Sequence, residues 1–199
     1  MQNGIDVSYC QAGFDFQQAA AEGKTFCVVR IGRTTGYGTQ ELDDYFIDHI
    51  NAAKAAGMDL GIYFYSLATT TQEAEQEAKW LLDMMQTYLH GVELKAGIWL
   101  DVEEEQQKTL GPDVLAGVIM AWMNTMNRAD VYAGLYASYD TLTNYINMDA
   151  IPSYVPLFVA NYDDTNWYKA EHPERSVTMW QYSDSGNIGG MPVDLDVMY

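Results

Sequence analysis

Two carboxylate side chains end the apolar run Ala96–Glu103, and their types and spacing are those of a site for acid–base chemistry. Side chains alternate between the two faces of a strand, so Asp101 and Glu103 are expected to point the same way and to feel each other's charge. In a parallel barrel or open sheet, the C-terminal end of such a strand is where the loops build an active site. The alternative from these residues alone is an exposed strand end with a solvated acidic loop, which Glu104 and Glu105 would extend.

Composition restricts the class of protein. The chain has 199 residues, 48% of them hydrophobic, with no linker-like or low-complexity tract, so we expect one folded domain over residues 1–199. No apolar run reaches the length of a membrane span. The 28 acidic and 10 basic side chains give a formal net charge of −18, which disfavours nucleic acid as a partner. We expect a monomer that binds neither nucleic acid nor membrane, and whose ligand is neutral or cationic.

The residues that most often hold metals or form covalent links are few. Two cysteines, Cys10 and Cys27, cannot build a disulfide scaffold or a four-ligand zinc site, and the sequence leaves open whether they pair. The three histidines show no metal-ligand spacing with the acids. We therefore expect no metal and no cofactor. The N-terminal residues Met1–Gly4 lack the basic and apolar regions of a signal peptide, so we expect export by another route or a trimmed domain.

The elements that must position the acids alternate along the chain. Apolar strand-like runs and amphipathic helical patterns follow each other as far as residue 146, and after it come strands without amphipathic helices between them. About five β/α units and three closing strands predict an α/β fold, a modified eight-stranded TIM-like barrel. The expected strands are residues 4–8, 26–31, 60–65, 96–103, 131–136, 156–160, 177–182 and 193–197, and the expected helices are residues 14–22, 42–56, 71–89, 112–128 and 139–146.

Acids recur at the ends of these strands. Asp6 ends the first strand, and Asp194 lies in the last one. The first and last strands of a closed barrel are neighbours, so Asp6 and Asp194 are expected to converge beside Asp101 and Glu103. Crowded carboxylates raise the pKa of at least one of them, and a carboxyl group that stays protonated near neutral pH can act as a general acid. This is the equipment of a glycosidase.

Six segments in order along the chain carry a resemblance. Together they resemble the glycoside hydrolase family 25 muramidases, the Chalaropsis-type lysozymes. The resemblance implies a (β/α)5(β)3 barrel and a lysozyme (N-acetylmuramidase) that hydrolyses the β-1,4 bond between N-acetylmuramic acid and N-acetylglucosamine in peptidoglycan. The segments are Gly4–Gln11, Gly61–Tyr65, Trp99–Glu103, Tyr136–Ser138, Leu157–Tyr162, and Trp180–Ser183 with Val193–Asp196.

The resemblance also implies roles for the acids. Glu103 matches the general acid, which protonates the departing oxygen and later activates water. Asp101 matches the acid that orients the substrate's N-acetyl group, whose oxygen attacks the anomeric carbon with retention of configuration; direct attack by a carboxylate is the alternative. Asp6 and Asp194 match supporting acids. Asp196 stands where Asn is more usual, and we rank it below Asp194.

The predicted substrate-binding residues are aromatic or polar. The third strand has Phe64 and Tyr65 where many family members have His and Phe, so the aromatic lining of the groove departs from the family pattern. For each predicted residue a core or supporting position is the alternative, and a buried Tyr with a hydrogen-bonded hydroxyl is common. The predicted residues are Tyr63, Tyr65, Tyr136, Asn161 and Trp180.

Two other functions stay open. A chitinase-like glycosidase would use the same acids, but the longer acid series that marks chitinases is absent. A catalytically silent wall-binding module would be favoured by loss of the general acid, whereas all four acids are present. We expect peptidoglycan glycan strands as the partner and an extracellular or cell-wall location, reached by secretion or by delivery from a phage.

Overall fold

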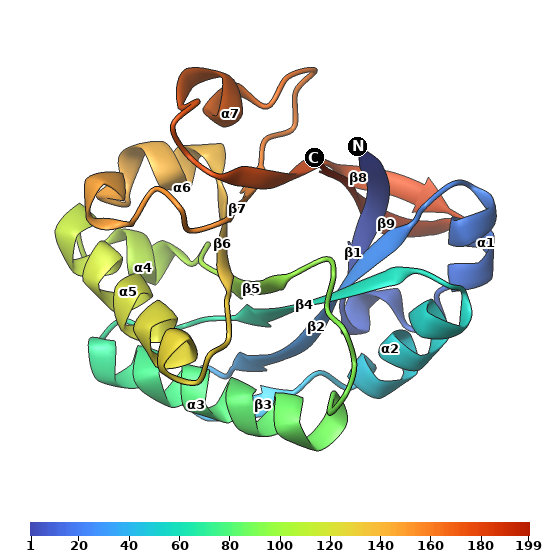
Figure 1. Cartoon of the computed structure of the whole chain (residues 1–199), viewed down its shortest axis with the longest axis horizontal. Coiled ribbons are helices and arrows are strands. Elements are labelled where there is room, and N and C mark those ends of the chain that lie inside the picture. Colours follow the sequence, from blue (N-terminus) through green and yellow to red (C-terminus); the bar gives the residue numbers. More distant parts are fainter.

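A closed barrel of mixed strands forms the centre of the protein. The computed structural model describes residues 1–199. Its nine-stranded sheet has the order β1-β9-β8-β7-β6-β5-β4-β2-β3, and the additional pairing of β1 with β2 closes it into an eight-stranded barrel that leaves β3 outside (Figure 1). The strands are β1 (Gln2–Val7), β2 (Phe26–Thr34), β3 (Gln40–Leu42), β4 (Asp59–Tyr65), β5 (Ile98–Asp101), β6 (Gly134–Ser138), β7 (Leu157–Ala160), β8 (Val177–Ile188) and β9 (Met191–Met198).

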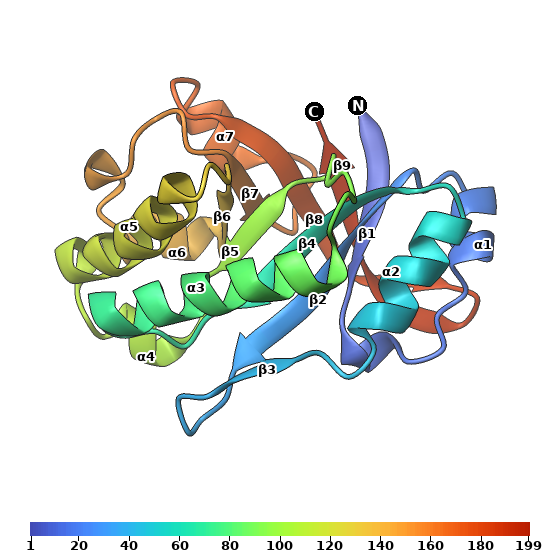
Figure 2. The same cartoon turned by 60° about the horizontal axis from the view of Figure 1, so that its bottom comes forward.

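Helices lie around the parallel part of the barrel, from α1 and α2 at the right of Figure 1 through α3 at the bottom to α5 and α6 at the left, and α3 and α5 pack against each other (Figures 1 and 2). Local sequence explains where they begin: Thr70 and Glu73 form a reciprocal capping box at the start of α3, and Pro112 occupies the first turn of α5, where no backbone N–H is needed. The helices are α1 (Phe16–Ala21), α2 (Phe46–Ala55), α3 (Thr71–Tyr88), α4 (Glu105–Lys108), α5 (Pro112–Arg128), α6 (Tyr139–Asn144) and α7 (Trp167–Glu171), with short 3-10 turns η1 (Tyr9–Gln11) and η2 (Met148–Ala150).

The strand directions confirm the predicted (β/α)5(β)3 order. Neighbouring strands from β1 through β2 and β4 to β8 run parallel, whereas β9 is antiparallel to both β8 and β1. The β8–β9 connection is a hairpin whose two turn residues, Gly189 and Gly190, have φ values of 62° and 88°. Positive φ at both positions is what this tight hairpin turn requires, and glycine accepts it without strain.

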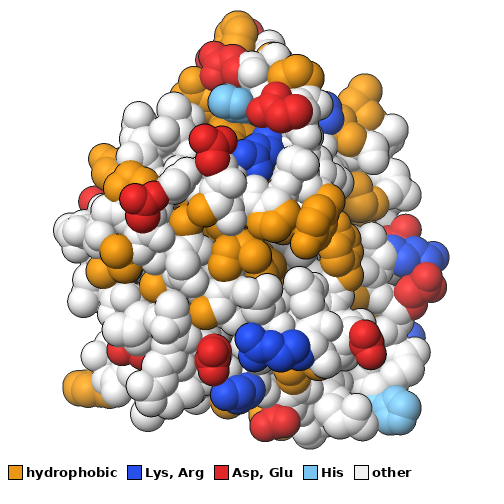
Figure 3. Space-filling model, turned by 60° about the vertical axis from the view of Figure 1, so that its left-hand side comes forward, with side chains coloured by type: hydrophobic (Ala, Val, Ile, Leu, Met, Phe, Trp, Pro, Cys, Tyr) orange, Lys and Arg blue, Asp and Glu red, His pale blue; other side chains and the backbone are white.

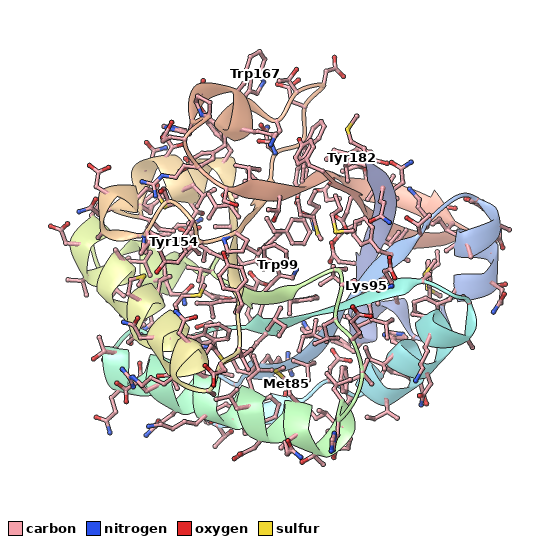
Figure 4. The ribbon with its side chains drawn as sticks, viewed as in Figure 1. Met85, Lys95, Trp99, Tyr154, Trp167 and Tyr182 are labelled. Atoms are coloured by element: carbon pink, nitrogen blue, oxygen red, sulfur yellow. The ribbon has the colours of Figure 1, made fainter.

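Two apolar cores hold the barrel together. The larger one, of 42 buried residues, lies between the strands and the helices. The smaller one lies inside the barrel around Trp99, which projects from β5 towards the barrel centre (Figure 4). Gly134 on β6 leaves the space for this ring, because a Cβ atom there would lie 2.4 Å from the Trp99 side chain. The inner core consists of Phe26, Val28, Ala96, Trp99, Phe158 and Met179.

Several predicted boundaries are wrong. The helix expected from residue 42 begins at Phe46, because Gln40–Leu42 forms β3 in a hairpin with the end of β2. The strand expected over 96–103 is Ile98–Asp101. Glu104 and Glu105 do not form a solvated loop, since Glu104 caps α4 and Glu105 begins it. A five-residue helix, α7, lies between β7 and β8, where no helix was expected.

The surface on the side of α5 and α6 carries both apolar and charged side chains. Figure 3 shows apolar side chains gathered near the middle of this face, with acidic and basic side chains scattered around them.

None of the helices combines the length and the apolar character needed to cross a bilayer.

Candidate active site

A pocket opens at the C-terminal end of the parallel strands. It has a volume of about 150 Å³, and most of its lining is polar or aromatic. All four acids predicted from the sequence lie in its wall, together with two of the predicted tyrosines. The lining residues are Asp6, Tyr63, Asp101, Glu103, Tyr136, Phe158, Tyr162, Gln181 and Asp194.

Strand β5 delivers two of the acids. Asp101 is its last residue and is 4% exposed, while Glu103 lies beyond the strand and is solvent-exposed. The backbone between them stays in place because the N–H of Val102 donates to the carbonyl of Tyr136 at 3.0 Å and the Asp101 carbonyl accepts from the N–H of Ser66 at 3.1 Å. Glu103 thus reaches the same pocket as Asp101 although it lies outside the strand.

Gln181 on β8 connects the other two acids. Its Nε2 donates to Oδ2 of Asp6 at 2.8 Å and to Oδ2 of Asp194 at 3.4 Å. Its Oε1 accepts from the hydroxyls of Tyr136 at 2.9 Å and Tyr162 at 2.7 Å. The amide therefore joins the two acids of β1 and β9, on one side of β8, to the two tyrosines of β6 and the segment after β7, on its other side.

The crowding of these carboxyl groups shifts their pKa values upward. Burial, and then the charge of Asp194, raises the pKa of Asp6 to about 8; burial, and then Asp184, raises that of Asp194 to about 6. The pKa of Asp101 is raised by burial and by Glu103, and its Oδ1 has no hydrogen-bond donor. Loss of solvent on the pocket side and the charge of Glu104 raise the pKa of Glu103. The site can hold protons at pH values where isolated carboxyl groups have lost them.

One buried cation lies next to this cluster. Arg30 on β2 is 8% exposed; its Nε and Nη2 contact Oδ2 of Asp43 at 2.8 Å and 2.7 Å, and its guanidinium stacks on Tyr9 with 4.7 Å to the ring centroid. The positive charge of Arg30 lowers the pKa of Asp101 and of Glu103, against the larger effect of burial. Arg30 therefore partly offsets the repulsion among the acids.

Three predicted substrate-binding residues lie outside the pocket wall. The Tyr65 hydroxyl donates to Glu104, and Tyr65 lines an adjoining hollow with Tyr9 and Arg30. The Trp180 indole donates to the carbonyl of Asn161 at 2.7 Å, and the Asn161 side chain accepts from the N–H of Trp167 at 2.9 Å. Trp180 precedes Gln181 on β8, so its side chain points away from the face that carries the amide.

Sequence reasoning did not select three of the lining residues: Phe158, Tyr162 and Gln181. All three lie in segments that carried the resemblance, and Gln181 lies next to the chosen Trp180. Alternation along β8 would have separated the two, because only every second side chain of a barrel strand faces the interior.

Comparison with known proteins places this geometry in a family. The sequence pattern of glycosyl hydrolases family 25 matches residues 5–191. The autolytic lysozyme of Clostridium acetobutylicum is 28% identical over 199 residues, a match that covers 98% of this chain and 54% of the relative. The chain thus spans about half the length of this curated relative.

Solved structures share the fold. The modular autolysin LytC of Streptococcus pneumoniae superposes with a TM-score of 0.82 at 23% identity, over 100% of this chain and 46% of LytC. The catalytic domain of endolysin ply40 from bacteriophage P40 of Listeria monocytogenes gives a TM-score of 0.76 at 22% identity, over 100% of this chain and 93% of that domain. With the matched sequence pattern and the acid-lined barrel mouth, these findings show that the chain belongs to glycosyl hydrolase family 25.

Proposed function

We propose that this chain is a muramidase domain that hydrolyses the β-1,4 bond between N-acetylmuramic acid and N-acetylglucosamine in bacterial peptidoglycan. The observation that carries the proposal is the convergence of Asp6, Asp101, Glu103 and Asp194 on one pocket in a family 25 barrel. Paired carboxyl groups of unequal acidity are what glycoside hydrolysis needs. A structure of LytC contains a synthetic peptidoglycan ligand, which supports the same substrate class here.

Glu103 is assigned the role of general acid. It is the most accessible of the four acids, at the mouth of the pocket, and its raised pKa favours the protonated form that a general acid needs. In the first step it protonates the glycosidic oxygen as the bond to the anomeric carbon breaks. In the second step the same group, now a carboxylate, takes a proton from the attacking water.

Asp101 is assigned to the substrate's acetamido group. It lies deeper than Glu103, so it can accept a hydrogen bond from the acetamido N–H and turn the acetamido oxygen towards the anomeric carbon. Attack by that oxygen retains the configuration after water completes the reaction. Asp6 and Asp194 hold the charge and geometry of the pair, and Tyr63, Tyr136 and Tyr162 offer flat faces and hydroxyls for the sugars. The remaining predicted residues lie outside the pocket wall and would position the residues that line it. They are Asn161, Trp180 and Tyr65.

The test is digestion of purified peptidoglycan, with mass spectrometry of the reducing ends. The wild type is expected to release muropeptides that end in reducing N-acetylmuramic acid, and Glu103→Gln is expected to be slower by at least ~100-fold. Glu93→Gln is the matched control, because Glu93 is an exposed residue that precedes β5 at the opposite end of the strand. It is expected to keep the wild-type rate.

Two outcomes would replace the proposal. A protein that sediments with cell walls but releases no fragments is a wall-binding module. A protein that cleaves chitin oligomers and leaves peptidoglycan intact is a glycosidase of similar chemistry with another substrate. The proposed place of action is the bacterial cell wall, outside the cell, where an endolysin or autolysin would be bacteriolytic.

A further inference from the structure

Asp196 on β9 is a carboxyl group buried behind the pocket. It is 0% exposed, and neither of its carboxyl oxygens has a hydrogen-bond donor. Its register partners are Gly4 on β1 and Gln181 on β8. Gly4 has no side chain, and the Gln181 amide is engaged by Asp6, Asp194 and two tyrosines. Asp196 therefore lies where an ionised carboxylate would have neither water nor a donor.

The acids near Asp196 make its ionisation less favourable. Asp6 on β1 and Asp194 on β9 lie on the same interior face of the barrel as Asp196, whereas Cys27 on β2 and Tyr182 on β8 are neutral groups on the outer face of their strands that would ionise to anions. Lys24, before β2, is the one cation that acts on Asp196, and it is only partly buried. An unpaired carboxylate in such a place costs several kcal/mol. Burial and the two acids accordingly raise the pKa of Asp196.

Asp6 offers the acceptor that a protonated Asp196 needs. Asp196 is the register partner of Gly4, and Asp6 lies two residues further along the same face of β1, so the two side chains are diagonal neighbours inside the barrel. Asp6 lines the pocket and receives the Gln181 amide at Oδ2, whereas Asp196 is sealed from the pocket. When the pair has lost one of its two protons, the remaining proton resides on Asp196, because Asp6 is the one whose negative charge can be stabilised.

We propose that Asp196 is a positioning residue, which keeps its proton and donates it in a hydrogen bond to Asp6, so that Asp6 is held in the pocket between Asp196 and Gln181. Its role is that of a neutral donor, which an amide can also fill. This inference deepens the proposed function, and its activity test rests on that function.

The activity test compares Asp196→Asn with Asp196→Ala on peptidoglycan. Asn keeps a donor of the same size, so its kcat/KM is expected to stay within a few-fold of the wild type at pH 6. Ala removes the donor, so a loss of ~10-fold or more is expected, since a buried polar group left without its partner costs about 1–3 kcal/mol. In the pH profile of kcat/KM, the change caused by the ionisation of Asp6 should also move to higher pH in Asp196→Ala, because Asp6 loses a donor. In Asp196→Asn it should stay in place. Equal losses in the two variants would overturn the proposal.

A stability test needs no substrate and stays decisive if the protein cleaves nothing or Asp196→Ala does not fold. A raised pKa means that the folded state keeps a proton which the unfolded state releases, so wild-type stability falls as pH rises from about 4 towards the folded pKa. Asp196→Asn has no such proton. The Tm advantage of Asp196→Asn over the wild type is therefore expected to grow with pH between 4 and 8.

Asp44→Asn is the matched control, because Asp44 is exposed. Between pH 4 and 8, the Tm difference between Asp44→Asn and the wild type is expected to change much less than the Tm difference between Asp196→Asn and the wild type. If the Tm difference of Asp196→Asn is equally constant, Asp196 is ionised in the folded protein and the proposal is wrong.

Discussion

Asp6 and Asp194 are direct register partners on the antiparallel strands β1 and β9, and a single amide nitrogen, Nε2 of Gln181 on β8, reaches both carboxyl groups. The pairing of β1 with β9 also joins the two ends of the chain in the barrel wall. The pairing that joins the two ends of the chain therefore also brings Asp6 and Asp194 together. A substitution that weakens the pairing of β1 with β9 is expected to lower activity as well as stability. The hydrogen bonds of Gln181 connect the strand pairing to the acids.

Gln181→Leu is expected to lower kcat/KM on peptidoglycan by about 10–100-fold, since it removes a donor from Asp6 and an acceptor from two tyrosine hydroxyls. The loss should come mainly from kcat, because the acids lose their geometry while the aromatic faces remain. Gln86→Leu, an exposed position on α3, controls for the change in composition. Similar kinetics for the two variants would show that the amide network has no part in the reaction.

Two charges near Glu103 should shift the pH dependence in opposite directions. Glu104 raises the pKa of Glu103 and Lys108 lowers it. The alkaline limb of kcat/KM, where the general acid loses its proton, is therefore expected at lower pH in Glu104→Gln and at higher pH in Lys108→Met. Shifts in the same direction, or none, would mean that another group governs this limb.

The buried pair of Arg30 and Asp43 should matter far more to stability than the exposed pair beside it. Asp43→Asn leaves the buried guanidinium without its partner, so the free energy of unfolding is expected to fall by about 3–5 kcal/mol. Glu41→Gln breaks the Arg33–Glu41 pair, whose side chains are 43% and 45% exposed, and is expected to cost at most about 1 kcal/mol. Urea unfolding of both variants measures the two losses in the free energy of unfolding. Equal losses would show that water reaches Arg30 in the folded protein.

Two glycine substitutions should act with opposite signs. A Cβ atom at Gly134 would lie 2.4 Å from the Trp99 ring and 2.7 Å from the Pro156 carbonyl, so Gly134→Ala is expected to destabilise the barrel by about 1–3 kcal/mol. Nothing lies within 4 Å of a Cβ at Gly117 in the middle of α5, and Gly117→Ala is expected to stabilise by about 0.5–1 kcal/mol. Thermal unfolding of the pair tests whether the barrel interior is as tightly packed as the structure indicates.

Much of the fold could be predicted from local sequence patterns. The alternation of apolar strands and amphipathic helices predicted the barrel because each unit is encoded within about thirty residues. Asp6, Asp101, Glu103 and Asp194 were predicted to converge for the same reason, since strand ends can be read locally and the topology brings them together. The β3 hairpin was missed because three polar-rich residues become a strand only when β2 offers them an edge, and α4 and α7 were missed because they are too short for a periodic pattern.

The amino-acid sequence by itself determined the class of fold, the acids at the strand ends and the family to which the chain belongs. Only the tertiary structure decided which side chains share the pocket with those acids, and which lie behind it. Gln181, Tyr162 and Asp196 owe their positions to contacts between strands far apart in the chain, and their protonation and hydrogen bonding depend on burial. Burial and the distances between charges are set only when the barrel closes, so they cannot be predicted from a local sequence pattern.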